Sequence, residues 1–211
     1  HNYVAGSLPW GVRMFSALMG YGGNRQLGRQ QIADVAAHGE HARTDASVLL
    51  AVVDRRDGFN QQAAPIFQQL SAEYSRNVLF AVEAAEALEA AGEHDAARAQ
   101  FQQVLDRAAA DAPGYRRAPL DKVWYDLGNI ERVFSRWSSA VADFQRVEAL
   151  PQAQPRYRQA AALAAGEVEA SAGQPVLARV QFEHCEALDP SSPAGKEAAH
   201  ELSLSAPNPR P

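Results

Sequence analysis

Two short stretches of this chain place histidine beside groups that could take part in chemistry. His38 and His41 flank Glu40, so two imidazoles and a carboxylate stand close together in the sequence, as a metal site would require. The spacing differs from the His-Glu-x-x-His pattern that puts two imidazoles on one helix face, and a glycine interrupts it. His184 precedes Cys185, but adjacent helical residues point about 100° apart, so the imidazole does not face the thiol. We therefore predict no catalytic group, no metal site and no cofactor, and we expect that the chain is not an enzyme.

Two features near the start of the chain have competing interpretations. The glycine-rich run Gly20–Asn24 could be compared with a phosphate-binding loop, but no strand precedes it and no Lys-Ser/Thr pair follows. A turn between helices fits it better. An apolar stripe before this run could lie on a membrane surface or on a partner helix, but we favour burial against the next helical pair. Its members are Trp10, Met14, Phe15, Leu18 and Met19.

Composition limits both the class of protein and the class of partner. The chain has 211 residues, of which 46% are hydrophobic, and a formal net charge of −5. That length can bury a sizeable core, and the negative charge argues against nucleic acid as a partner. A single cysteine excludes an internal disulfide. No apolar run approaches the roughly 18 residues needed to span a bilayer. Because the chain starts at His1, we expect a processed or partly ordered product, so that a leader, a lipid anchor or a whole upstream segment could be missing.

A small pattern recurs along the chain and predicts how its elements are organised. All four copies combine an alanine, a phenylalanine and a further apolar residue at constant spacing, and three of them also carry a glycine. The copies are Gly58, Ala63, Phe67 and Leu70; then Gly92, Ala97, Phe101 and Val104; then Ala140, Phe144 and Val147; then Gly173, Ala178, Phe182 and Cys185. The first two copies are 34 residues apart, which is a period typical of a repeated helix–turn–helix unit. We therefore predict a stack of helical hairpins with the four phenylalanines buried.

Wider intervals between copies indicate where the repeat is interrupted. Between the second and third copies the spacing grows by nine residues, which we assign to an exposed loop over Ala109–Ala118. Thr44 is expected to cap the first full repeat. The resulting division has an atypical helical hairpin over residues 1–42 and four repeats over 43–190. A capping helix over 191–204 and a loose proline-rich tail over 205–211 complete it.

One copy carries a family resemblance. The run Trp124–Asn129 is similar to the consensus for the first helix of a tetratricopeptide repeat, and Ala140, Phe144 and Pro151 stand at or within one residue of further consensus places. Glu131 departs from the consensus, which has an aromatic residue there. The resemblance implies an all-α fold, namely a right-handed α-solenoid of about five helical hairpins with a short C-terminal capping helix.

A narrower resemblance concerns origin and location. Asn2-Tyr3, Gly23–Gly28 and Tyr74–Asn77 resemble stretches of bacterial tetratricopeptide proteins that are often exported. This resemblance implies a bacterial protein and favours the periplasm over the cytoplasm. It supplies no activity that could be assigned to particular residues.

The resemblance also implies which side chains line the concave groove, the surface that solenoids use for binding. The candidates lie on the first helices of three units: Val48, Val52, Arg55, Val82, Glu86, Glu89, Lys122, Tyr125, Asn129 and Arg132. The last four partly resemble a clamp for peptide carboxylates, but Val52 and Glu86 stand where that clamp needs an asparagine and a basic residue. The valines and Tyr125 favour instead a groove that grips an amphipathic helix or an extended segment.

The sequence thus predicts a non-catalytic protein–protein interaction scaffold or adaptor. Its partner would be another protein or a peptide segment held in the groove, with Tyr125 as an anchor and Asn129 and Arg132 as polar guides. Two other functions stay open. The chain could be an accessory subunit of a larger membrane or filament assembly, or a periplasmic module of an enzyme or carbohydrate-binding protein whose active part lies upstream of residue 1.

Overall fold

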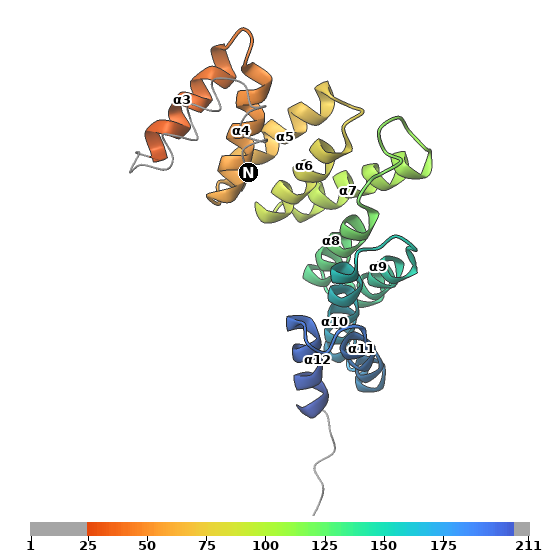
Figure 1. The fold of residues 1–211 in the computed structure, drawn as a ribbon. Helices are drawn as coiled ribbons and strands as arrows, with labels where there is room; N and C mark the ends of the chain where they lie inside the picture. Colours follow the sequence, from red (N-terminus) through yellow and green to blue (C-terminus); the bar gives the residue numbers. More distant parts are fainter. Residues whose placement is uncertain (1–24, 205–211) are drawn as a thin grey trace, which may run out of the picture.

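The protein is described by a computed structural model that covers residues 25–204, and every regular element in that range is an α-helix. The helices follow one another along an elongated, curved array (Figure 1). Their bounds are α3 Arg25–His38, α4 Arg43–Arg56, α5 Asn60–Glu73, α6 Val78–Ala90, α7 His94–Ala109, α8 Leu120–Val133, α9 Trp137–Ala149, α10 Pro155–Ser171, α11 Pro175–Leu188 and α12 Pro193–Leu204. The prediction of an all-α solenoid is confirmed.

Short connections make the helices pair as hairpins. Three residues each join α4 to α5, α6 to α7, α8 to α9 and α10 to α11, and such short links place the two helices side by side. Helix α3 precedes the four hairpins and packs on α4, while α12 follows them and packs on α11 and α10. The predicted turn at Gly20–Asn24, the apolar stripe from Trp10 to Met19 and the tail over 205–211 lie outside the described residues.

The recurring glycine has a backbone reason. Gly58, Gly92 and Gly173 each sit in a hairpin connection with φ between +74° and +84°, a left-handed conformation that costs glycine little. The α8–α9 connection lacks a glycine, and Ser135 adopts φ +55° at the corresponding place. The third copy of the pattern therefore keeps the same turn without the residue that favours it.

The repeated phenylalanine fills the space between paired helices. Phe67, Phe101, Phe144 and Phe182 are at most 3% exposed, which confirms the predicted core. Each ring belongs to the second helix of its hairpin, and two of the rings lie directly against a glycine of the first helix. A Cβ added to Gly128 would lie 2.5 Å from the Phe144 ring, and one added to Gly166 would lie 2.5 Å from the Phe182 ring. In these two hairpins the ring packs against the backbone of the facing helix.

This contact makes a testable prediction about packing. Gly128→Leu should lower the free energy of unfolding by about 1–3 kcal/mol, because the new side chain must displace the Phe144 ring from a closed core. Urea denaturation measures the loss. The double variant Gly128→Leu/Phe144→Ala should lose less than the two single variants together, since the leucine then occupies the vacated space. Strict additivity would mean that the two side chains do not meet.

One local prediction is wrong and another holds with one exception. Thr44 is not a helix cap: α4 begins at Arg43, and the Thr44 hydroxyl instead lies 2.9 Å from the hydroxyl of Tyr74, the residue that follows α5. Seven of the ten residues of Ala109–Ala118 are exposed, as predicted for a loop, and one residue of this segment is buried. Tyr115 is 2% exposed with Arg107 stacked 4.3 Å from its ring centroid, and Gly114 packs against the carbonyl of Arg76. A buried tyrosine between polar neighbours anchors this loop on the preceding hairpin.

Candidate functional site

The first helices of the hairpins lie on the inner side of the curve. Helix α8 contacts both α6 and α10, so the first helices of successive hairpins meet directly. Within the described range, the strongest contacts of the second helices α5, α7, α9 and α11 are to first helices or to α12. Helices that approach one another more closely occupy the inside of a curved stack. The groove residues predicted from the sequence are on α4, α6 and α8, which are the helices of this inner side.

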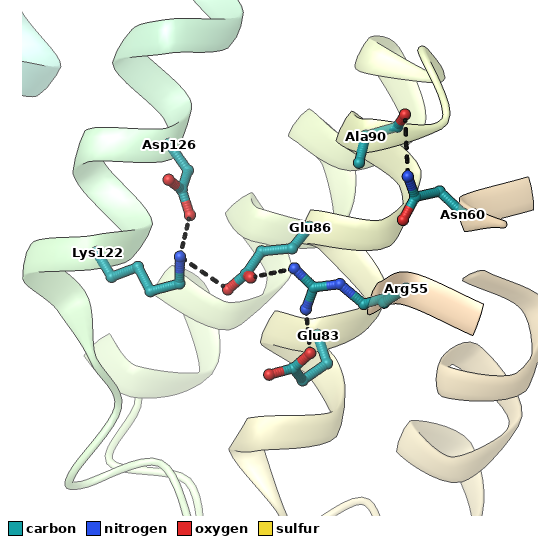
Figure 2. A network of polar contacts seen from close by, with 7 residues as sticks. All are labelled: Arg55, Asn60, Glu83, Glu86, Ala90, Lys122 and Asp126. Carbon is teal, nitrogen blue, oxygen red and sulfur yellow. Dashed lines mark hydrogen bonds and ion pairs between the residues drawn. The ribbon is translucent and has the colours of Figure 1, made fainter. Parts of the chain in front are cut away.

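The structure brings several predicted groove residues into one ion-pair network (Figure 2). Arg55 of α4 donates to Glu83 and, over 2.8 Å, to Glu86 of α6. The ammonium of Lys122 on α8 lies 3.1 Å from Glu86 and 3.3 Å from Asp126. Glu86 therefore sits between a guanidinium from the preceding hairpin and an ammonium from the following one. We call these five residues, Arg55, Glu83, Glu86, Lys122 and Asp126, the inner-face network.

Two members of the network were not among the predicted site residues. Glu83 lies one helical turn before Glu86, and Asp126 lies one turn after Lys122. Spacings of three and four residues place side chains on the same helix face, so this signal was present in the sequence. What the spacing could not show is which of these charges meet across the gap between α4, α6 and α8.

Burial changes the protonation of the carboxylates around this network. Desolvation, reinforced by nearby Glu86, raises the pKa of Asp126 to about 6 despite the attraction of Lys122. Glu89, one turn beyond Glu86 on α6, has its pKa raised to about 7 by burial and by the charge of Asp126. Burial alone would lower the pKa of Lys122, but Asp126 and Glu86 raise it above its ordinary value. The Lys122 ammonium therefore stays charged. Among residues 25–204, more carboxylates than cations lie around it.

Aromatic rings form the next part of the inner face. Tyr125 of α8 is half-buried, with its ring centroid 5.8 Å from that of Phe144 and 5.9 Å from that of Tyr157 at the start of α10. Arg132 pairs with Glu167 of α10 over 2.8 Å and also donates to the side-chain oxygen of Asn129. Tyr125 is consequently part of the packing between two hairpins.

The three predicted valines differ in how much of the side chain is exposed. Val52 is 49% exposed, Val48 is partly buried against the core, and Val82 is 3% exposed within the core. A partner would thus meet α6 through Glu86 and Glu89 rather than through Val82. The arrangement is also unlike a clamp for a carboxylate, because the cations Arg55 and Lys122 already pair with carboxylates of the chain.

The sequence candidates for metal or thiol chemistry have ordinary surroundings. His38 pairs with Asp34 over 3.0 Å on the exposed face of α3, and no group of three metal-ligating side chains occurs among residues 25–204. Cys185 is buried, its thiol points to the carbonyl of Gln159 over 3.4 Å, and burial raises its pKa to about 11. A thiol in this environment is a core residue rather than a nucleophile.

The raised pKa of Glu89 predicts how stability depends on pH. The folded state holds this proton up to about pH 7, whereas the ordinary value for the unfolded chain is 4.5. The native state thus binds more protons between those values, and its stability falls as pH rises through them. Glu89→Gln should remove this loss and raise the free energy of unfolding at pH 8 by about 1 kcal/mol, with little change at pH 4.

Urea titrations at the two pH values measure the effect. The matched control is Glu197→Gln on the exposed part of α12. This variant should change the free energy of unfolding by no more than about 0.5 kcal/mol at either pH. A Glu89→Gln variant that is less stable than the parent at pH 8 would contradict the prediction that the ionised Glu89 carboxylate destabilises the folded state.

Comparisons with known proteins show what this fold is similar to. The chain aligns with a tetratricopeptide repeat protein from Parabacteroides merdae at 14% identity and TM-score 0.64, over 84% of this chain and 65% of that one. It aligns with the fragment of MamA from Desulfovibrio magneticus RS-1 that runs from residue 41 to the end, at 14% identity and TM-score 0.64, over 86% and 94%.

A further match comes from a complex. The APC/C hetero-tetramer Cut9-Hcn1 contains a chain that aligns at 16% identity and TM-score 0.59, over 86% of this chain and 34% of that one. No protein-family profile matches the chain, and no curated protein matches it by sequence. None of the described helices is both long and apolar enough to cross a membrane.

Proposed function

Because this chain has the fold of tetratricopeptide repeat proteins, we propose that it is a non-catalytic scaffold or adaptor that binds a polypeptide segment in its concave groove. The fold supports a role in protein interaction generally, since repeat solenoids present extended concave surfaces to their partners. The observation that carries the proposal is the composition of the inner face. Exposed Val52, the Tyr125–Tyr157 ring pair and the charged residues between them lie on consecutive first helices. Apolar anchors interleaved with polar groups suit an extended or helical segment.

The direct test is selection of binders from a random dodecamer peptide library on the full chain. Val52→Asp should reduce the binding free energy of the selected peptides by about 1–3 kcal/mol, because it places a charge at an apolar contact. Val176→Asp is the matched control: Val176 is 75% exposed on α11, a second helix. The control variant should bind the selected peptides as tightly as the parent protein does, as measured by fluorescence polarisation. Loss on Val176→Asp with no loss on Val52→Asp would overturn the groove proposal.

Tyr125→Ala is expected to weaken the same peptides by about 1–3 kcal/mol. Since Tyr125 also packs on Phe144 and Tyr157, the variant should in addition melt at a lower temperature, unlike a purely exposed anchor. Tyr125→Phe keeps the ring packing and removes only the hydroxyl, so it separates the two effects. Full retention of affinity by the folded Tyr125→Ala protein would exclude the ring as an anchor.

One observation favours a second candidate, an accessory subunit of a larger assembly. Val176, Leu177 and Val180 of α11 are each at least 49% exposed, and they lie within one and a half turns of one helix. Clustered exposed apolar residues are typical of surfaces that contact other proteins. In that case Val176→Asp would disrupt association with the other subunits while Val52→Asp would not.

A further inference from the structure

We propose that the groove selects a basic segment, and that a lysine or arginine of the partner pairs with Glu89 beside the inner-face network. This inference rests on the proposed function, and it specifies the chemistry of the partner for the same groove. It concerns a different residue from those that make the apolar contacts, so the two ideas can fail separately.

The balance of charge on the inner face is the first argument. Among residues 25–204, four carboxylates, from Glu83, Glu86, Glu89 and Asp126, surround two cations, Arg55 and Lys122. Both cations are already shared, because Arg55 pairs with two carboxylates and Lys122 with another two. Glu89 is in the field of both cations but has neither of them as an ion-pair partner in the part of the chain that the structure describes. An incoming cation would neutralise the remaining negative charge.

Second, within residues 25–204, two buried carboxylate oxygens of the network lack a well-aligned hydrogen-bond donor. Asp126 is 8% exposed, and its Oδ2 has the Lys122 ammonium 3.3 Å away as an ion-pair partner but accepts no well-aligned hydrogen bond from the described residues. The same holds for Oε1 of Glu86, which is 3.1 Å from that ammonium. Two desolvated carboxylate oxygens thus face one ammonium that satisfies neither fully. Buried acceptors in this state favour an additional donor, and a guanidinium or ammonium supplies several.

The third argument is the position of this acidic centre within the groove. Lys122 and Asp126 are on α8, the helix that also carries Tyr125, and the ring centroid of Tyr125 lies 5.9 Å from that of Tyr157. On the other side, Arg55 and the exposed Val52 are both on α4, one turn apart. A peptide in the groove would therefore cross the acidic centre between an apolar contact and an aromatic one. A basic side chain flanked by apolar residues matches that order.

The same geometry makes the interaction depend on pH. The charged groups that face Glu89 are Arg55 from α4, Glu86 from its own helix, and Lys122 and Asp126 from α8. Burial and the carboxylate of Asp126 raise the pKa of Glu89 to about 7 in the free protein. A bound cation favours the ionised carboxylate, so binding of a basic segment should release a proton near neutral pH and strengthen as pH rises.

The experiment uses the dodecamers selected on the full chain. We expect the groove-bound peptides to contain lysine or arginine, and Glu89→Gln to weaken them roughly tenfold at pH 8 and much less at pH 5.5. Replacing the basic residue of the peptide with methionine should produce a similar loss and should abolish the effect of Glu89→Gln. The matched control is Glu197→Gln, an exposed carboxylate on α12.

Two results would overturn the inference in different ways. If selected peptides respond to Val52→Asp but are neutral or acidic, or if they ignore Glu89→Gln at pH 8, the groove binds peptides without the basic contact. The proposed function would then stand and this inference would not. If Val52→Asp leaves the affinity of the peptides unchanged, the groove is not the binding surface, and both proposals are wrong.

Discussion

Replacing Phe144 with alanine is expected to lower the free energy of unfolding by about 3–5 kcal/mol. The ring is fully buried, it covers Gly128 of the facing helix, and it touches the ring of Tyr125. Truncation removes its transfer free energy and leaves a cavity that cannot collapse, because the backbones of α8 and α9 already cross closely. Urea denaturation followed by circular dichroism measures the loss.

The control for this variant is Val176→Ala, which truncates a side chain that is 75% exposed. It should change stability by no more than about 0.5 kcal/mol. Equal losses for the two variants would mean that the repeated phenylalanine does not hold the hairpins together.

Replacing Arg29 with methionine is the second change with a large expected effect. Asp54 of α4 is 0% exposed, and Arg29 of α3 donates to both of its carboxylate oxygens. Without the guanidinium, a buried carboxylate must either stay charged without a partner or take up a proton. We expect a loss of about 3–5 kcal/mol at pH 7.

The pH dependence of this loss identifies its cause. At pH 5 protonation of the stranded carboxylate takes less free energy, so the loss should be smaller than at pH 7. Adding Asp54→Asn to Arg29→Met should recover a large part of the stability, since it removes the stranded charge. Arg56→Met is the control, because Arg56 pairs with its neighbour Asp57 at the exposed end of α4 and should contribute less than about 1 kcal/mol. A loss that is identical at both pH values would point to packing rather than charge.

Several features of the fold could be predicted because they depend on neighbours in the sequence. The hairpin turn needs a left-handed residue, so glycine recurs at Gly58, Gly92 and Gly173. A phenylalanine follows each of these glycines by nine residues, because its ring packs inside the same hairpin. The fourth turn shows the limit of this logic, since Ser135 adopts the left-handed conformation that glycine favours elsewhere.

The candidate site was predictable only in part. The register placed Arg55, Glu86, Lys122 and Tyr125 on the inner face, and the helices carry them there. Their pairing was not predictable, because it depends on how far each hairpin rotates relative to the next. The same is true of Tyr115, whose burial under Arg107 follows from how the long loop folds back onto the preceding hairpin.

By itself, the sequence determined the solenoid, because periodic small and aromatic residues specify helix crossings that each involve one hairpin and its neighbour. Only the tertiary structure decided which side chains the inner face exposes. It buried Val82, used Arg55 and Lys122 to join hairpins, and left Glu89 beside them without an ion pair to any of residues 25–204. The physical reason is that charge pairing and desolvation depend on distances of a few ångströms between helices that are about thirty residues or more apart in the chain, and the repeat period does not encode those distances.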